Sequence, residues 1–429
     1  MSARDTIFAV SSGAPPAGIA IVRISGPRAL PVAAVIAGAL PDPRRAALRV
    51  LRDPRDGAVL DHAITLVFTG PRTATGEDCV EFHVHGGRAV VAAVEAAIAT
   101  QPGTRHAEAG EFTRRALENG IIDLTEAEGL GDLLAAQTEG QRRAALRMAE
   151  GGLRVLVERW SDDLVGIAAR IEAQLDFSDE DDVSDEALGT IAADIAQIAE
   201  ALEQVLRAPS VERLHEGVRV VIAGAPNSGK STLLNALTGR DVAIVSPISG
   251  TTRDRIEASV VRAGMAYVLT DTAGLTQTPG DAIEQIGIDR AREAIAGADI
   301  VVWLDQPGDG SVSDIRVHAR CDMSGRETPA GGADVALSAR TGQGVEALWE
   351  LIADRATKLL PQADSVAVNR RQRLLLARCR DALRAANNSD LLIVAEETRR
   401  ALRALDDVAG RSGIEDVLDA IFSRFCIGK

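Results

Sequence analysis

One glycine-rich stretch, GAPNSGKS at residues 224–231, constrains the fold more than any other part of the chain. It fits the pattern G-x-x-x-x-G-K-[ST] at every fixed position. The apolar run at 218–223 before it predicts a buried strand, and the residues at 231–237 after it suit a helix. Glycines let the backbone wrap a polyphosphate, because they reach dihedral angles that a Cβ atom forbids, and N–H groups at a helix N-terminus face the anion. We therefore predict a nucleotide site in which Lys230 reaches the outer phosphates and Ser231 holds Mg²⁺.

Length and composition limit the remaining possibilities. At 429 residues the chain is long enough for about two to four domains. Its hydrophobic fraction is 46% and its aromatic fraction 3%, so we expect aliphatic cores. A formal net charge of −15 argues against non-specific nucleic-acid binding by the whole surface. The four cysteines form no C-x-x-C pair, and no signal-peptide or membrane-length apolar run is present. We therefore predict a cytoplasmic protein with no membrane partner.

The N-terminal part mixes strand and helix patterns. We expect strands at 19–22, 63–68 and 79–85 and a helix at 88–100, which together predict an α+β domain over residues 1–119. His83 and His85 share one face of the third strand. Without a third ligand nearby, such a pair is more typical of a polar sheet face than of a metal site, and we predict no metal there.

Two helical blocks flank the nucleotide segment. Residues 120–215 and 362–429 are predicted to be helical, and apolar residues recur every three or four positions from Leu153 to Ile167. The acidic cluster at 179–182 is expected in a turn between helices. Residues 216–361 alternate strand and helix patterns. We therefore expect the two blocks to pack together, with the nucleotide domain as an insertion between them.

Further segments complete the predicted nucleotide site. The loop at 246–252 contains threonines that can supply a second Mg²⁺ ligand. A hairpin, with strands at 256–261 and 267–269, leads into DTAG at 271–274, where an aspartate after a buried strand suits Mg²⁺ through water. Strands are also expected at 300–304 and at 333–337, the second followed directly by Ser-Ala-Arg at 338–340.

These segments, in this order and spacing, resemble a Ras-like GTPase domain. The guanine-reading N-K-x-D element of such domains aligns with Ala319-Arg320-Cys321-Asp322, in which only Asp322 matches. An aspartate that pairs with two guanine nitrogens is the discriminating group, so GTP specificity can survive. The missing polar partner would weaken affinity by about 1–3 kcal/mol. Asp322 could alternatively serve stability alone.

The flanking segments narrow the resemblance. RISG at 23–26, TGEDCVEFHVHGG at 75–87, GEFTRRALENG at 110–120, IDLTEAEGLGDLL at 122–134 and the terminal FCIGK resemble the MnmE family, also called TrmE, of tRNA modification GTPases. The likeness covers essentially the whole chain. It implies an N-terminal α+β folate-binding domain that builds a homodimer, a helical domain and an inserted Ras-like P-loop GTPase domain.

The resemblance also implies an activity and partners. Such proteins bind 5-formyl- or 5,10-methylene-tetrahydrofolate and join an FAD-dependent partner of the MnmG, or GidA, type in a heterotetramer. The complex installs an aminomethyl or carboxymethylaminomethyl group at C5 of the wobble uridine (U34) of certain tRNAs. GTP hydrolysis in the family needs K⁺, which acts in place of an arginine finger as two nucleotide domains meet across the dimer.

Site residues follow by motif. The implied GTP-binding residues are Asn227, Ser228, Gly229, Lys230, Ser231, Thr232, Ser246, Pro247, Ile248, Ser249, Gly250, Thr251, Thr252, Asp271, Thr272, Ala273, Gly274, Asp322, Ser338, Ala339 and Arg340. The implied metal ligands are Ser231 and Thr252 for Mg²⁺, and Asn227, Ser246, Ile248 and Thr251 for K⁺. The implied folate contacts are Arg23, Glu81 and Lys429. Ile121 stands where the family has another folate-contacting lysine.

Two catalytic roles and two alternative functions stay open. Glu284 matches a family glutamate that orients the attacking water, but it could be an ordinary helix-surface acid. Cys426 could take part in the folate and uridine chemistry, or be an inert thiol. Arginines at 142–147 and 370–403 could contact tRNA phosphates or pair with acidic neighbours. The alternative functions are an RNA-binding switch GTPase in ribosome assembly and a regulatory module with a degenerate nucleotide site.

Overall fold

The computed structural model describes residues 5–176, 185–239, 257–272, 291–306, 308, 311, 314–329, 331–361, 366–386, 390–411, 415–423, 425, 427 and 428. The chain divides into two compact units. The first comprises Met1–Gly131, Ala149–Asp162 and Leu402–Lys429, and the second comprises Asp132–Met148 and Asp163–Ala401. The predicted division into four domains is finer than this one and remains a prediction.

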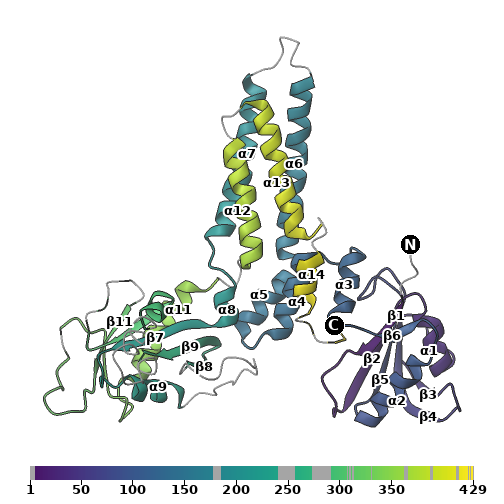
Figure 1. Ribbon diagram of the computed structural model, residues 1–429, viewed down its shortest axis with the longest axis horizontal. Coiled ribbons are helices and arrows are strands. Elements are labelled where there is room, and N and C mark those ends of the chain that lie inside the picture. Colours follow the sequence, from purple (N-terminus) through teal and green to yellow (C-terminus); the bar gives the residue numbers. More distant parts are fainter. Residues whose placement is uncertain are drawn as a thin grey trace, which may run out of the picture. The chain divides into compact units, whose positions relative to one another are not determined.

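A six-stranded sheet in the order β3-β4-β5-β2-β1-β6 forms the centre of the first unit (Figure 1). Its strands are β1 (Thr6–Val10), β2 (Ile19–Ser25), β3 (Ala47–Arg52), β4 (Val59–Phe68), β5 (Cys79–His85) and β6 (Thr104–His106). β6 runs parallel to β1, and the other neighbouring pairs are antiparallel. The strands predicted at 19–22, 63–68 and 79–85 are confirmed as β2, the end of β4 and β5.

Two helices, α1 (Ala29–Ala37) and α2 (Arg88–Ala99), cover one face of this sheet. Successive side chains of a strand point to opposite faces. In β2, Val22 and Ile24 are therefore fully buried in the core under these helices, whereas Arg23 lies on the opposite face. The helix predicted at 88–100 is confirmed as α2, which ends at Ala99 with Thr100 in the C-cap position.

The C-terminal residues return to this unit. Helices α3 (Glu111–Glu118), α4 (Leu124–Ala135) and α14 (Glu415–Phe422) bring together a small apolar cluster that includes Ala127, Phe422 and Phe425. Beyond it, Ile427 forms an antiparallel bridge with Ala109. Gly428 has a φ of 98°, and a Cβ atom added there would lie 2.0 Å from the carbonyl oxygen of Val10. Only glycine permits both this dihedral angle and this close approach to β1.

The second unit contains a sheet in the order β12-β11-β10-β7-β9-β8. Its strands are β7 (Val218–Gly224), β8 (Glu257–Arg262), β9 (Met265–Asp271), β10 (Ile300–Leu304), β11 (Asp314–Ala319) and β12 (Val335–Leu337). β8 and β9 form an antiparallel hairpin, and all other neighbours run parallel. The strands predicted at 218–223, 300–304 and 333–337 and the predicted hairpin are confirmed.

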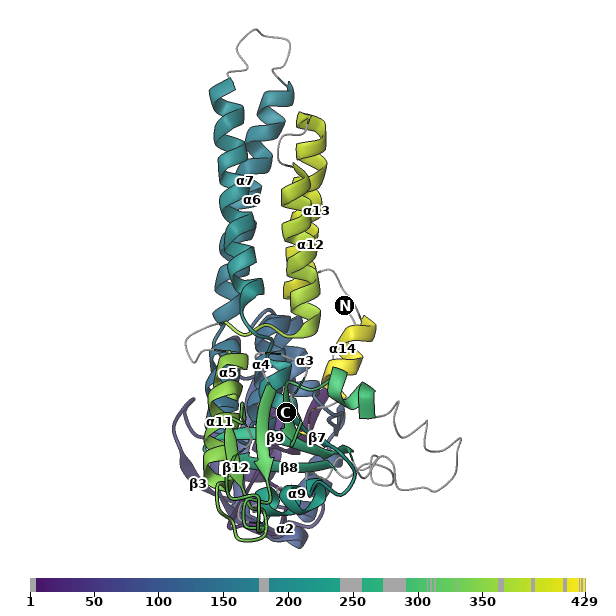
Figure 2. The same ribbon diagram turned by 90° about the vertical axis from the view of Figure 1, so that its left-hand side faces the viewer.

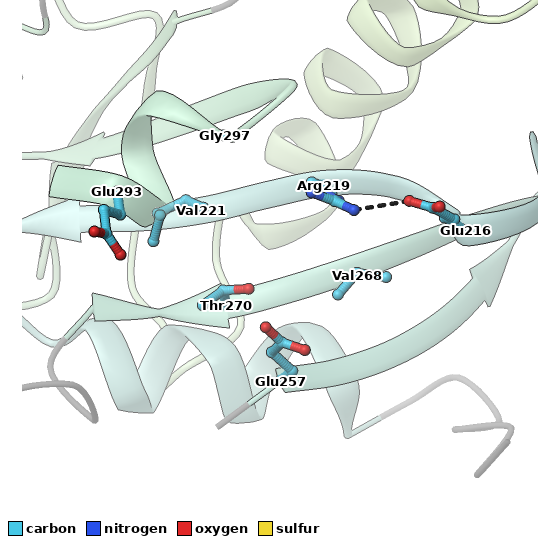
Figure 3. A pocket seen from close by; sticks show the side chains of 9 residues that line it. Glu216, Arg219, Val221, Glu257, Val268, Thr270, Glu293 and Gly297 are labelled. Atoms are coloured by element: carbon cyan, nitrogen blue, oxygen red, sulfur yellow. Dashed lines mark hydrogen bonds and ion pairs between the residues drawn. The ribbon is translucent and has the colours of Figure 1, made fainter. Parts of the chain in front are cut away.

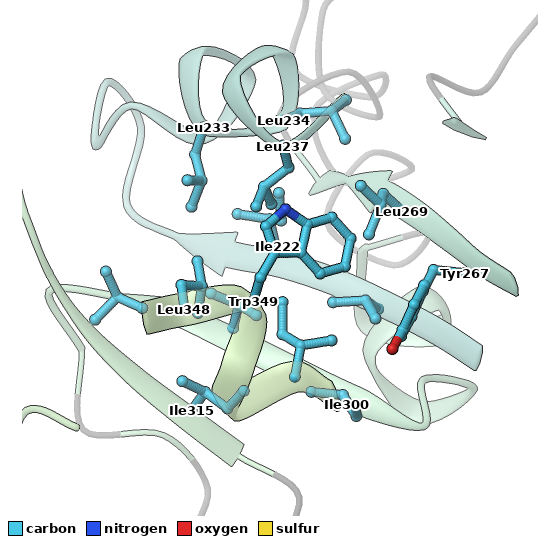
Figure 4. Packing of buried hydrophobic residues seen from close by; sticks show 14 of the residues in the cluster. Ile222, Leu233, Leu234, Leu237, Tyr267, Leu269, Ile300, Ile315, Leu348 and Trp349 are labelled. Atoms are coloured by element: carbon cyan, nitrogen blue, oxygen red, sulfur yellow. The ribbon is translucent and has the colours of Figure 1, made fainter. Parts of the chain in front are cut away.

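Helices α9 (Lys230–Thr238) and α11 (Val345–Leu359) pack on one face of this sheet (Figure 4). Fully or nearly fully buried aliphatic side chains dominate the core between them, as the low aromatic content predicts. Tyr267 and Trp349 add one aromatic contact, edge-to-face with ring centroids 5.2 Å apart. α9 begins directly after the glycine-rich stretch, so the core fixes the helix whose N-terminus faces the predicted phosphate site.

Further helices are α5 (Glu139–Ala149), α6 (Gly152–Asp176), α7 (Asp185–Arg207), α8 (Glu212–Glu216), α12 (Arg370–Ala386) and α13 (Leu391–Ala409) (Figures 1 and 2). Within the second unit α7 packs along α12. Arg380 and Arg384 of α12 both pair with Glu203 of α7, at 3.0 and 3.1 Å. The expectation that the two helical blocks pack together is therefore confirmed. No helix among the described residues has the length and hydrophobicity needed to cross a membrane.

Candidate functional site

The carboxyl ends of five parallel strands meet at one edge of the second sheet. The register places Gly224 of β7 beside Leu304 of β10, and Ala319 of β11 beside Leu337 of β12. β9 ends at the same edge with Asp271, which pairs with Ile222 of β7. Ligands of such sheets bind beyond the carboxyl ends of the strands. The predicted nucleotide residues that the structure describes all lie at these strand ends or in the segments that follow them.

The glycine-rich loop has the backbone that the motif predicts. Gly224 has a φ of 155°, and a Cβ atom there would lie 3.0 Å from both the Leu304 carbonyl oxygen and Ser228 Oγ. Gly229 is left-handed and caps α9. Asn227, with a φ of 61°, takes the same left-handed region although it is not glycine. Such strained positions gather at ligand-binding loops. The glycines at 224 and 229 and the left-handed Asn227 thus give the loop the backbone that the motif requires.

Lys230 folds back over this loop. Its Nζ donates to the carbonyl oxygens of Gly224 and Ala225, each at 2.9 Å. Only 5% of the residue is exposed. Burial lowers the pKa of the Lys230 ammonium, and the negative charge of Asp271 opposes this shift. These contacts hold the cation over the loop, where it can reach an anion bound to the N–H groups.

A hydroxyl and a carboxylate meet at the start of α9. Ser231 Oγ donates to Asp271 Oδ2 at 2.5 Å, and Asp271 is completely buried. Thr272, the next residue, donates its hydroxyl to the Ile222 carbonyl oxygen at 3.0 Å, which fixes the end of β9 against β7. Mg²⁺ prefers such oxygen ligands and binds proteins through one or two carboxylates together with water and phosphate oxygens. The Ser231–Asp271 pair therefore fits the predicted Mg²⁺.

The predicted base-reading residues lie on two neighbouring segments. Asp322 is exposed in the turn that follows β11, and Ser338 and Ala339 follow β12. The N–H of Cys321 donates to the Leu337 carbonyl oxygen at 3.1 Å, which joins the two segments. The Ser338 side chain accepts the N–H of Thr341, at 3.2 Å. The structure thus brings the two predicted segments side by side.

Several predicted residues lie outside the described residues. They are Ser246, Pro247, Ile248, Ser249, Gly250, Thr251, Thr252, Ala273, Gly274, Glu284, Cys426 and Lys429. The acidic cluster at 179–182 lies outside them as well.

A cavity of about 460 Å³ lies on the other face of the same sheet (Figure 3). Val221 of β7 and Val268 and Thr270 of β9 line it, together with Glu216, Arg219, Glu257, Glu293, Ala294 and Gly297. None of these residues belongs to the predicted nucleotide site. The core on α9 and α11 takes the alternate residues of the same strands, such as Ile222 and Leu269.

The first unit brings together two of the predicted folate contacts. Arg23 of β2 and Glu81 of β5 are opposite each other in the register and form an ion pair, with Nη2 2.9 Å from Oε1. Glu81 also contacts His83 Nε2 at 3.2 Å, and the Arg23 guanidinium lies 5.6 Å from the centre of the Phe112 ring. His85, on the same strand, pairs with Asp61. Among the described residues, no group of three or more metal-ligating side chains gathers around a common point.

The structure adds residues that the sequence did not single out. Arg115, only 5% exposed, pairs with Glu77 at 3.0 Å and with Glu111 at 2.9 Å. Asn119 donates to the Thr75 carbonyl oxygen at 2.6 Å. Two of the family-like segments, at 75–87 and 110–120, are therefore linked by a buried charge network. The two segments are far apart in the sequence, so the sequence alone did not indicate that they are in contact. Both contain several acidic and basic residues.

Many of the arginines considered for RNA have partners within the chain. Arg373 donates to the carbonyl oxygens of Leu206 and Ala208. Other arginines pair with acidic side chains: Arg380 and Arg384 with Glu203, Arg399 with Glu172, Arg400 with Glu397, and Arg142 and Arg143 with Glu139. For these residues the alternative of pairing with acidic neighbours is confirmed.

Comparisons with known proteins cover both units. A family model described as the GTP-binding protein TrmE N-terminus matches residues 6–121, and one described as the MnmE helical domain matches residues 124–426. The G domain of the T. maritima FeoB iron transporter is 26% identical over 32% of this chain and 98% of that chain, with a TM-score of 0.24. At that TM-score this likeness adds nothing to the assignment.

Relatives that match over nearly the whole of this chain establish its family. The tRNA modification GTPase MnmE of Rhizorhabdus wittichii is 54% identical over 100% of this chain and 97% of its own length. The proteins of the same name from Erythrobacter litoralis and Zymomonas mobilis are 51% and 48% identical, each over 99% of this chain and 100% of their own length. With the phosphate loop, the Ser231–Asp271 pair and matching flanks in place, the chain belongs to the MnmE family of tRNA modification GTPases.

Proposed function

We propose that this GTPase works with an FAD-dependent partner of the MnmG type and a folate one-carbon donor. Together they install an aminomethyl or carboxymethylaminomethyl group at C5 of the wobble uridine of certain tRNAs, in the cytoplasm. The observation that carries the proposal is the Ser231–Asp271 contact beside the phosphate loop, in a chain that matches the family from end to end. The two rival functions lack a comparable observation, since the relatives are named as tRNA modification GTPases.

Each residue of the nucleotide site has a distinct proposed role in binding or hydrolysis. Backbone N–H groups of the loop and of the start of α9 bind the phosphates, and Lys230 neutralises their charge. Ser231, with Asp271 behind it and Thr252 proposed as the second ligand, would hold Mg²⁺, which would supply positive charge beside the phosphates. We propose that Glu284 orients the attacking water. Asp322, Ser338, Ala339 and the neighbouring Arg340 are proposed to surround the base.

We further propose that K⁺ stabilises the charge that develops between the phosphates. Asn227 is the proposed side-chain ligand, and it is exposed at the rim of the loop. The other proposed ligands are carbonyl oxygens of Ser246, Ile248 and Thr251. A fixed monovalent cation there stabilises the transition state as an arginine would. The arrangement needs two nucleotide domains to face each other, and hence a dimer.

The open face of the first sheet supports self-association through this unit. Leu48, Ile64 and Ile21 share one cross-strand row with His83. Leu48 is 63% and Ile64 44% exposed, and Ile19 at the end of β2 is 62% exposed. An apolar row of this kind on an open sheet face is typical of an interface. The Arg23–Glu81 pair lies on the same face, one row away, so a second copy would lie close to it.

The same pair supports folate binding. A carboxylate held in place by a guanidinium can accept hydrogen bonds from the N–H groups of a pterin ring. The Arg23 and Glu81 side chains are 17% and 14% exposed, so they are accessible and yet fixed. Ile427 and Gly428, which lie between Cys426 and Lys429 in the sequence, contact Ala109 and Val10 of β1. The C-terminal residues therefore belong to this unit. Ile121 packs against Gly76 and supplies no charge where the family has a lysine.

The wobble nucleosides of cells that lack this protein test the proposal most broadly. We expect mass spectrometry of total tRNA to show loss of the C5-substituted wobble uridines, because no other step in the proposal supplies the substituent. A plasmid copy of the natural chain should restore them. Unchanged levels of these nucleosides in the deleted strain would refute the proposed function.

Potassium dependence and self-association can be tested together. GTP hydrolysis by the full chain should be about tenfold or more faster in KCl than in NaCl, because K⁺ supplies transition-state charge. Ile64→Asp should abolish this stimulation and shift the protein toward monomer in sedimentation, because a charge would be buried in the interface. The control is Val35→Asp, which changes a residue that is 52% exposed on α1 over the opposite face. Equal rates in both salts would rule out the K⁺ mechanism.

Docking of the C-terminal tail should control folate affinity. Gly428→Ala would push the tail from Val10, so we expect the affinity for 5-formyl-tetrahydrofolate, measured by calorimetry, to fall about tenfold through loss of the Lys429 contact. Gly57→Ala is the matched control, because Gly57 also has a positive φ, of 77°, but has no atom within 4 Å of an added Cβ. Equal affinity in the Gly428 variant and the natural chain would separate the tail from folate binding.

A further inference from the structure

The segment that carries Asp322 lacks the asparagine of Ras-like domains and has Ala319 in its place. A methyl group cannot hydrogen-bond to neighbouring loops. The segment nevertheless has a defined path: it leaves β11 at Ala319, turns through Asp322 and passes Arg326. The contacts that fix this path come from a residue outside the motif.

That residue is Asp305, which directly follows β10. Its Oδ1 accepts a hydrogen bond from the backbone N–H of Ala319, at 3.0 Å, and another from Nη2 of Arg326. Arg326 Nε in turn donates to the carbonyl oxygen of Ala319 at 3.0 Å. Both backbone polar groups of Ala319 are thus bound by the Asp305–Arg326 pair. Charged groups make stronger hydrogen bonds than neutral ones, so the pair can replace a side-chain amide.

A second cation joins this pair to the phosphate loop. Arg320 Nη1 donates to the carbonyl oxygen of Asn227 at 3.4 Å, a long contact, while its Nη2 lies 3.8 Å from Asp305 Oδ2. His318 completes the surroundings: its Nδ1 is 3.8 Å from Asp305 Oδ1, and its Nε2 lies 2.9 Å from the Arg326 carbonyl oxygen. The base-reading segment and the phosphate loop therefore share one set of contacts.

Backbone strain points to the same place. Among the described residues, five that are not glycine have a positive φ, and three of them belong to this network: Asn227, Asp305 and Arg320, at 61°, 54° and 57°. Strain of this kind persists only where surrounding contacts hold it, and it gathers at functional sites. Asp305 and Arg326 are 23% and 30% exposed, so their ion pair contributes little to overall stability. A role in positioning the Ala319 backbone accounts both for the strained dihedral angles and for an ion pair that adds little to stability.

We propose that Asp305 and Arg326 are positioning residues for base recognition. They hold the backbone of Ala319 and thereby set where the Asp322 carboxylate meets the guanine ring, and Arg320 ties that setting to the phosphate loop. The inference deepens the proposed role of Asp322 and rests on it. It predicts that guanine selectivity in this chain depends on two residues that do not touch the base.

The test compares nucleotide affinities of the full chain by competition titration with GTP, ATP and xanthosine triphosphate. Arg326→Ala should lower the affinity for GTP about tenfold and leave that for ATP unchanged, so that the GTP/ATP ratio falls. Arg326→Lys, which keeps the charge, should restore part of the ratio. Arg316→Ala is the matched control: it removes an arginine of β11 that pairs with Asp334, just before β12, and that is not among the residues that bind the Ala319 backbone. It should leave the ratio unchanged.

Asp322→Asn separates this inference from the role on which it rests. An amide at that position should favour xanthosine triphosphate over GTP, because xanthine has an oxygen where guanine has an amino group. If Asp322→Asn leaves selectivity unchanged, the base-reading role itself is wrong. If it switches selectivity but Arg326→Ala keeps the natural GTP/ATP ratio, the positioning role is overturned. If the Arg326→Ala variant does not fold, the Asp305→Asn variant takes its place, because asparagine has nearly the same shape as aspartate. Its GTP/ATP affinity ratio then decides whether the positioning role holds.

Discussion

Parallel pairing of β7 with both β9 and β10 is the constraint on which the nucleotide site depends. It aligns Gly224 with Leu304 and Ile222 with Asp271, so that the phosphate loop, the buried carboxylate and the residue after β10 meet at one edge. α9 is held on the same sheet by Leu233 and Leu237. The loop between them has little freedom, and Lys230 and Ser231 are placed by packing that lies behind them.

In the first unit, the register between antiparallel strands likewise determines which side chains lie next to each other. Pairing of β2 with β5 sets Arg23 opposite Glu81 on the open face, while the alternate residues form the core under α1 and α2. The chain end is bound to this unit by backbone geometry, through the Ile427 bridge and the close approach of Gly428 to Val10. In both units, therefore, strand register places charged groups, and glycine allows the backbone contacts next to them.

Local patterns predicted much of this architecture, because their causes are local. The run before Gly224, the alternation at 79–85 and the hairpin around Gly264 each carry enough signal in a few residues, and all three are confirmed. The position of Lys230 and Ser231 followed from the motif. The order of strands in each sheet could not be read in this way, because it depends on contacts between segments far apart in the chain. β6, only three residues long, has too short a pattern to detect.

The same limit explains why no sequence pattern pointed to some residues near the site. Asp305 and Arg326 are separated by 21 positions and belong to no motif, so only the fold brings them to Ala319. The network of Arg115 with Glu77 and Glu111 likewise needs the loop before β5 to meet α3. The sequence shows that residues 319–322 lack the asparagine and lysine of the N-K-x-D pattern, and in the structure Asp305 and Arg326 bind the backbone of Ala319.

One measurement bears most directly on the central claim that the loop before Lys230 binds and activates the phosphates of GTP. It is the rate of GTP hydrolysis by the full chain with Mg²⁺ and K⁺ present. Lys230→Ala should lower this rate by at least about a hundredfold, since it removes the cation over the phosphates. Lys358→Ala, which removes a lysine 70% exposed on α11, should leave it unchanged. A Lys230→Ala protein that is folded and still hydrolyses GTP at the natural rate would contradict the account.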